Sequence, residues 1–154
     1  MRDHEIAQWL SVAERDVRSA VLLHNGNELE TSYYHCTQAV EKYLKTYLIA
    51  NNIEINYNHN ISETLKKCVN NNTTFLELFD ECNKMTANVN KLRYPMVMNI
   101  DKNHVKDGFS LIDKIKKLKP IQELYSGLID KYGENWENVL FKQIESIETD
   151  ASFR

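Results

Sequence analysis

The stretch YYHCTQAVEKYLKTYL, residues 33–48, constrains the fold more than any other part of the chain. On a helix, where successive residues turn by about 100°, its apolar side chains fall within an arc of roughly 140°. They are Tyr33, Cys36, Thr37, Val40, Tyr43, Leu44, Tyr47 and Leu48. The polar side chains Gln38, Glu41, Lys42 and Lys45 fall outside that arc. The pattern predicts a helix that packs one face against other helices and exposes the opposite face.

The same periodicity predicts helices elsewhere in the chain, separated by Asn, Gly and Pro. In addition to the helix that ends near residue 51, we expect helices over residues 3–24, 62–69, 74–92, 105–119, 121–132 and 136–147. Asp3, Thr31 and Thr74 are the expected N-terminal caps. The expected buried stripe of the first helix is Ile6, Trp9, Leu10, Ala13, Val17, Ala20 and Val21, with the charged residues, including Asp16, largely outside it.

Composition agrees with an all-α fold. The 154 residues are 42% hydrophobic and include only four Gly and two Pro, whereas strand-rich folds of this length need more turn residues. Short connections favour an up-and-down antiparallel bundle of four to five core helices. We expect the bundle over residues 1–120 and a C-terminal helical extension and tail of the same domain over residues 121–154. The extension holds seven acidic and three basic residues, a balance of -4 within a total of -3.

Three observations bear on the compartment. The N-terminus has no apolar run typical of a signal peptide, and no stretch is long and apolar enough to span a membrane. Three cysteines with no close pair, Cys36, Cys68 and Cys82, are typical of buried reduced thiols. We therefore expect a cytoplasmic protein that does not contact membranes. No CxxC pair, HExxH motif or Gly-rich phosphate loop is present, so we predict no metal and no cofactor.

The run Cys36 to Lys45, CTQAVEKYLK, resembles the signature helix of HEPN domains, which are small helical bundles often found beside nucleotidyltransferases. Three further features fit the same pattern over roughly residues 5–118. They are the preceding helix with Ala13, Asp16 and Ala20, then His59 with Ile61 and Leu65, and finally Arg93-Tyr94-Pro95. The resemblance implies a homodimer, a nucleotide or RNA ligand and a nucleotidyltransferase-type partner.

HEPN ribonucleases carry an Arg followed four to six residues later by a His, which acts as acid or base toward the ribose 2′-hydroxyl. Here the first His after Arg93 is His104, which is too distant for that motif. A literal match, Arg18 to His24, lies on the first helix with its side chains about 120° apart. The standard motif is thus missing from its expected place, and the chain is more typical of a binding module than of an enzyme.

The predicted ligand site is centred on Arg93 and Tyr94, because Arg grips phosphate with paired donors and Tyr can stack on a base. The alternative is structural, with Arg93 paired to a buried carboxylate such as Glu41. Gln38, Glu41, Lys42 and Lys45 either form a solvated face, or Lys42 and Lys45 join a basic groove with Lys66, Lys67, Lys91 and Arg93. His59 either contacts phosphate or a partner, as His35 can, or has a structural role in which it caps the following helix or packs under it.

Three functions remain open from the sequence. The first is a nucleotide- or RNA-binding module that acts with a nucleotidyltransferase-type partner. The second is an endoribonuclease toxin of a toxin–antitoxin pair, with Arg93 and His104 brought together as an atypical catalytic site. The third is a protein-interaction scaffold whose acidic extension docks another protein through Trp136 and Phe141.

Overall fold

The structure, a computed structural model, describes residues 2–92 and 99–142, and these residues form helices with no β-strand among them. Their order is α1 (Arg2–Asn25), α2 (Leu29–Ala50), α3 (Ile61–Asn71), the 3₁₀-helix η1 (Thr73–Leu78), α4 (Phe79–Leu92), α5 (Lys102–Lys117) and α6 (Lys119–Tyr132). A further helical segment begins at Trp136 and is described as far as residue 142. The prediction of an all-α helical bundle is confirmed.

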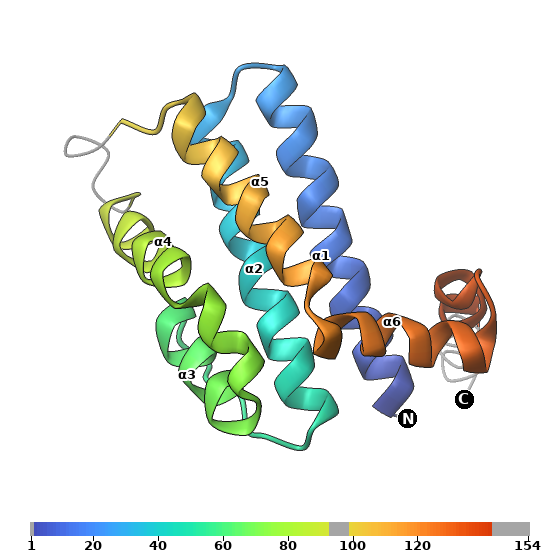
Figure 1. Cartoon of the computed structure of the whole chain (residues 1–154). Coiled ribbons are helices and arrows are strands. Elements are labelled where there is room, and N and C mark those ends of the chain that lie inside the picture. The colour runs from blue at the N-terminus through green and yellow to red at the C-terminus, as the bar shows by residue number, and fades with distance from the viewer. Residues whose placement is uncertain (1, 93–98, 143–154) are drawn as a thin grey trace, which may run out of the picture.

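Helix α2 lies at the centre of the bundle and contacts α1, α3, α4, α5 and α6. Figure 1 shows α1 and α5 beside α2, α3 and α4 on its other side, and α6 crossing the end of the bundle where α1 begins. The apolar arc expected over residues 33–48 forms the core, because Cys36, Val40, Tyr43, Leu44 and Leu48 are fully buried. This arc fixes which side of α2 stays polar.

The helix ends differ from the expected ones. Helix α2 begins at Leu29 without a side-chain cap, so Thr31 lies inside it. Asp3 also lies inside a helix, and its carboxylate accepts hydrogen bonds from Lys131 and Tyr132 of α6. The Asn72 side chain, rather than Thr74, caps the turn that follows α3. Asn can cap as well as Thr, so the run of Asn residues made the exact boundary ambiguous.

The buried stripe of α1 is also narrower than expected. Val21 is 43% exposed, and Trp9 and Val17 are only partly buried. Ala20 continues the stripe, and the neighbouring Val21 is turned about 100° away from it on the helix. By contrast Asp16, which we expected outside the stripe, is buried within it.

The cysteines behave as core residues. All three are free and buried, and burial raises the pKa of the Cys36 and Cys82 thiols to about 12. Such thiols stay protonated at neutral pH and are poor nucleophiles. Among the described residues, no helix has the length and apolarity needed to cross a membrane.

Two carboxylates of α1 hold α6 in place. Asp3 accepts hydrogen bonds from α6 as described above, and Glu14 Oε1 accepts from the hydroxyls of Tyr125 in α6 and Tyr43 in α2. Trp136 packs against the Tyr125 ring and is 7% exposed. Trp136 is therefore a core residue, which removes one of the two side chains that the scaffold hypothesis needs for docking another protein.

Two glycines that lie within helices differ in the space around them, so the same substitution should change stability differently at each. A Cβ atom on Gly108 of α5 would lie 3.0 Å from Cys36 Cβ, whereas one on Gly127 of α6 would meet nothing within 4 Å. Ala is a better helix former than Gly by up to about 1 kcal/mol. We expect Gly127→Ala to raise the free energy of unfolding by roughly that amount, and Gly108→Ala to lose the gain through crowding of α2 against α5. Urea unfolding checks both, and equal gains at the two positions would contradict the close packing.

Candidate functional site

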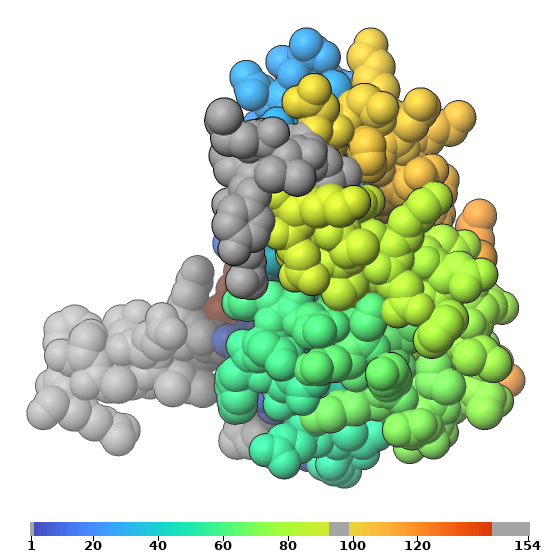
Figure 2. Space-filling model, turned by 90° about the vertical axis from the view of Figure 1, so that its left-hand side faces the viewer, coloured from blue at the N-terminus to red at the C-terminus, as the bar shows by residue number. Residues whose placement is uncertain are grey.

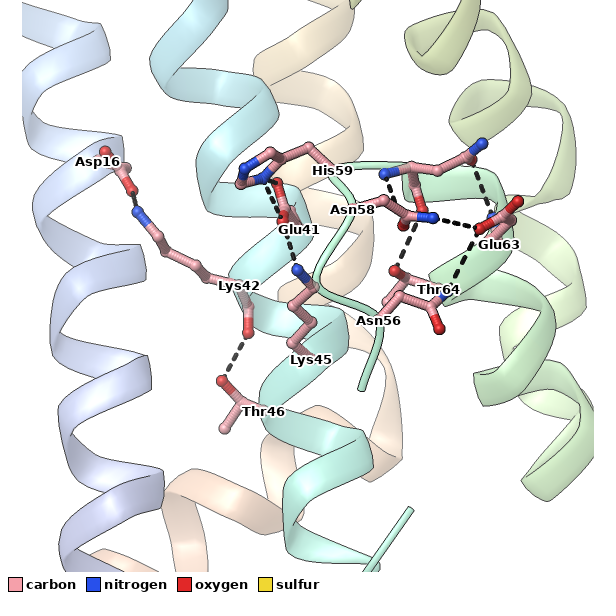
Figure 3. Close-up of polar contacts among 11 residues, drawn as sticks. Asp16, Glu41, Lys42, Lys45, Thr46, Asn56, Asn58, His59, Glu63 and Thr64 are labelled. Atoms are coloured by element: carbon pink, nitrogen blue, oxygen red, sulfur yellow. Dashed lines mark hydrogen bonds and ion pairs between the residues drawn. The ribbon is translucent and has the colours of Figure 1, made fainter. Parts of the chain in front are cut away.

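The polar side of α2 carries two ion-pair clusters that involve two other segments of the chain, α1 and the loop before α3. His35, Gln38, Lys42 and Lys45 lie near one face of the helix because they are spaced by three, four and three residues. Figure 3 shows Lys42 reaching toward α1 and Glu41 with Lys45 facing the loop that precedes α3. We call the set Asp16, His35, Gln38, Glu41, Lys42, Lys45 and His59 the α2 polar face.

The first cluster joins α1 to α2 through Asp16. Its Oδ1 lies 2.8 Å from His35 Nδ1, and its Oδ2 accepts a hydrogen bond from Lys42 Nζ at 2.5 Å. The Asp16 side chain is 11% exposed, and each of its oxygens has a nitrogen partner. A carboxylate can be buried when both oxygens are satisfied in this way. The imidazole and the ammonium remain partly open to solvent.

The second cluster is built on Glu41, whose Oε1 accepts from Lys45 Nζ at 2.6 Å and lies 2.9 Å from His59 Nδ1. The Glu41 and Lys45 side chains are only 6% and 5% exposed. A solvated face is therefore the wrong description of this pair, although its spacing of four residues was readable in the sequence. His59, in contrast, is 63% exposed, so the ring that contacts Glu41 remains open to solvent.

The Asn-rich loop before α3 explains how His59 reaches Glu41. The Asn60 side chain caps α3 by accepting a hydrogen bond from the Glu63 N–H, and Asn58 donates to the Glu63 carboxylate. These bonds fix both neighbours of His59, which then turns toward α2 (Figure 3). Of the structural roles expected for His59, capping of the helix falls to Asn60, and His59 is instead held by Glu41 of α2.

The two imidazoles are held in the same manner. Each presents Nδ1 to a buried carboxylate, so the opposite nitrogen, Nε2, faces away from that carboxylate. A carboxylate in this position fixes the orientation and tautomer of the ring. Lys42 lies between the two rings in sequence and retains N–H donors beyond the one used by Asp16. The α2 polar face thus offers two oriented acid–base groups and one cation.

The other predicted residues are distributed as follows. Gln38 is partly exposed on α2, whereas Arg93 and Tyr94 lie outside the described residues. His104 is at the start of α5, where its Nδ1 accepts the Asp101 N–H in a capping box. Its ring packs against Tyr33, which is turned about 200° from His35 around α2. The structure therefore does not bring His104 to the α2 polar face.

Of the other lysines proposed for a basic groove, Lys67 donates to the Glu54 carbonyl and Lys66 is exposed. His24, from the literal Arg-to-His match, packs edge-on against Phe109. No group of acidic, His or Cys side chains in the described residues could hold a metal ion.

Asp16 is the site residue that sequence reasoning placed wrongly. On a helical wheel it lies about 40° from Ala20, within the buried stripe. A carboxylate at a buried position needs a partner, so this angle was the available signal. The partners, His35 and Lys42, could be identified only once α1 and α2 were placed side by side.

No curated protein and no solved structure matches the chain significantly. The model of one family, described as "HEPN domain", matches residues 6–144, which include every described residue of the α2 polar face. The match also extends past residue 120 into the expected C-terminal extension. Since it covers most of the chain, the protein belongs to the HEPN domain family.

Proposed function

We propose that this HEPN domain is a nucleotide- or RNA-binding module whose ligand places its phosphates against the α2 polar face. The observation that carries the proposal is the pair of buried carboxylates, Asp16 and Glu41, that orient His35, Lys42 and His59 at the surface. Donors fixed in advance bind an anion without the entropy cost of ordering flexible side chains. Lys45 serves this site indirectly, because it is buried and fixes Glu41.

The charge balance of the α2 polar face favours a ligand that is recognised through oriented hydrogen-bonding groups. The carboxylates of Asp16 and Glu41 balance the ammonium groups of Lys42 and Lys45. Gln38, partly exposed on the same side of α2, adds an amide that can donate or accept. Arg93 and Tyr94 remain proposed members of the same site.

Binding of ATP, GTP and a short single-stranded RNA, measured by calorimetry at two salt concentrations, tests the proposal. We expect binding that weakens as the salt concentration rises, because contacts with phosphates depend on salt. Lys42→Ala should weaken it and reduce the salt dependence by about one phosphate contact. Lys106→Ala, an exposed lysine of α5, is the matched control. Absence of binding at low salt, or equal losses in the two variants, would remove the proposal.

A homodimer and a nucleotidyltransferase-type partner belong to the same proposal. Apolar side chains exposed on the surface, Leu22, Tyr34 and Tyr57 among them, support an interface with another chain. The family membership supports a partner of the nucleotidyltransferase type. Co-purification with the product of an adjacent nucleotidyltransferase gene, if the genome has one, would test that partner.

The second candidate is an endoribonuclease of a toxin–antitoxin pair, and one observation favours it. Two carboxylate-held imidazoles and an ammonium on one surface are a set suited to metal-independent cleavage, with one base, one acid and one cation. Arg93 with His104 remains the alternative catalytic pair. If the chain arrests growth on overexpression, relief by His59→Ala selects the α2 polar face and relief by His104→Ala selects the alternative. A wild-type chain that is harmless and leaves RNA intact would remove the candidate.

A further inference from the structure

A hollow of about 220 Å³ opens between α1 and α2, lined by Gln8, Trp9, Val12 and Lys42. Trp9 is partly exposed there, unlike the buried Leu10 beside it. An indole that is half covered by its own fold presents a large flat apolar surface to whatever enters the hollow. We call this feature the Trp9 hollow.

The Trp9 hollow is continuous with the α2 polar face through Lys42. The aliphatic stem of Lys42 helps to line the hollow, while its ammonium group lies 2.5 Å from Asp16 Oδ2. On α1, Trp9, Val12 and Asp16 follow one another at spacings of three and four residues, which places them along one side of the helix. An occupant of the hollow would therefore lie next to the Lys42 ammonium and the His35 ring that share Asp16.

The lining chemistry suits a nucleobase better than an aliphatic group. An aromatic wall stacks on the face of a base, and this contact tolerates every base because each has a π-face. The Gln8 amide, exposed at the rim, carries both a donor and an acceptor for the edge of a base. Pockets that enclose whole ligands usually measure about 300–1,000 Å³, so a hollow of 220 Å³ suits one ring system with the rest of the ligand outside.

We propose that the Trp9 hollow is the base subsite of the nucleotide- or RNA-binding site, in which a nucleobase stacks on Trp9 while the attached phosphates contact Lys42 and His35. This inference rests on the proposed function and adds to it the residue that recognises the base. Free nucleotides and unpaired bases of an RNA strand share this chemistry, and both are included in the test.

Tryptophan fluorescence can test the subsite directly, because the chain has only two Trp residues and Trp136 is buried. In a Trp136→Phe chain the signal comes from Trp9 alone. We expect ATP and a short single-stranded RNA to quench it, because a stacked base contacts the indole, and inorganic tripolyphosphate to bind without quenching. Calorimetry on the chain with Trp136 intact provides the same comparison without that substitution.

Substitution of Trp9 separates this inference from the proposed function. We expect Trp9→Ala to weaken ATP binding by about 10- to 100-fold while tripolyphosphate binding is unchanged, and Trp9→Phe to retain most of the affinity. Failure of every anion to bind the unmodified chain would overturn both proposals. Unchanged ATP affinity in Trp9→Ala would overturn the base subsite alone. So would a shift from dimer to monomer in Trp9→Ala without loss of ATP affinity, because the hollow would then be an interface between copies.

Discussion

Glu41→Ala is expected to lower the free energy of unfolding by about 3–5 kcal/mol, the cost of removing one partner of a buried ion pair. The Lys45 ammonium would remain in a site where its side chain is 5% exposed, without the carboxylate that compensates its charge. His59 would lose its Nδ1 partner at the same time. Urea unfolding measures the loss, with circular dichroism to confirm that the bundle still folds.

Two further variants show whether charge, rather than lost packing, causes that effect. Glu30→Ala, at an exposed position near the start of the same helix, should change stability by no more than about 0.5 kcal/mol. Replacing both partners with apolar residues, as Glu41→Leu with Lys45→Met, should recover most of the loss because no buried charge remains. A loss below about 1 kcal/mol in Glu41→Ala would show that the pair is solvated.

The second large effect is expected at Glu14, which joins four helices. Its Oε1 accepts hydrogen bonds from the hydroxyls of Tyr43 at 2.8 Å and Tyr125 at 2.5 Å and lies 3.1 Å from Lys116 Nζ. Tyr43 is fully buried, so Glu14→Ala leaves its hydroxyl without this acceptor. Each unsatisfied buried donor costs about 1–3 kcal/mol, so we expect a total loss of about 2–4 kcal/mol.

The same carboxylate makes stability depend on pH. Burial alone would raise the pKa of Glu14, but the hydrogen bonds from Tyr125, Tyr43 and Lys116 outweigh it and hold the pKa below its ordinary value of 4.5. The hydrogen bond from Lys131 likewise lowers the pKa of Asp3. Carboxylates of this kind stabilise the fold fully above their unfolded-state pKa and lose that contribution as the pH falls through the folded-state pKa.

Acid should therefore loosen the contact of α6 with α1, where both carboxylates act. We expect the free energy of unfolding to fall between about pH 5 and pH 3, and to fall less steeply in Glu14→Gln, which keeps an acceptor oxygen but does not titrate. Unfolding curves collected across that range check the difference. Identical pH profiles for Glu14→Gln and the unmodified chain would contradict a lowered pKa at Glu14.

Much of the fold could be predicted from helical periodicity, since the apolar arc of residues 33–48 is buried as expected. Individual boundaries could not, because Asn60 and Asn72 cap helices in a segment where many Asn residues qualify. Val21 shows the same limit for burial. It is apolar and near the stripe, yet it is exposed because it lies about 100° around α1 from the buried Ala20.

The candidate site was predictable in its residue types and less so in its geometry. The polar side of α2 and His59 were identifiable from the sequence, but the burial of the Glu41 and Lys45 pair depends on the loop that folds over it. Asp16 becomes a site residue only because α1 lies against α2. Figure 2 shows a face of the bundle that is formed largely by α3 and α4. None of the residues that line the Trp9 hollow comes from those two helices.

The central claim is that the α2 polar face is the ligand site, and the imidazole resonances in NMR spectra test it most directly. On titration with ATP, the signals of His35 and His59 should shift while those of His104 stay in place, because His104 packs against Tyr33 on another side of α2. Shifts confined to His104, with those of His35 and His59 unchanged at saturating ATP, would contradict the account.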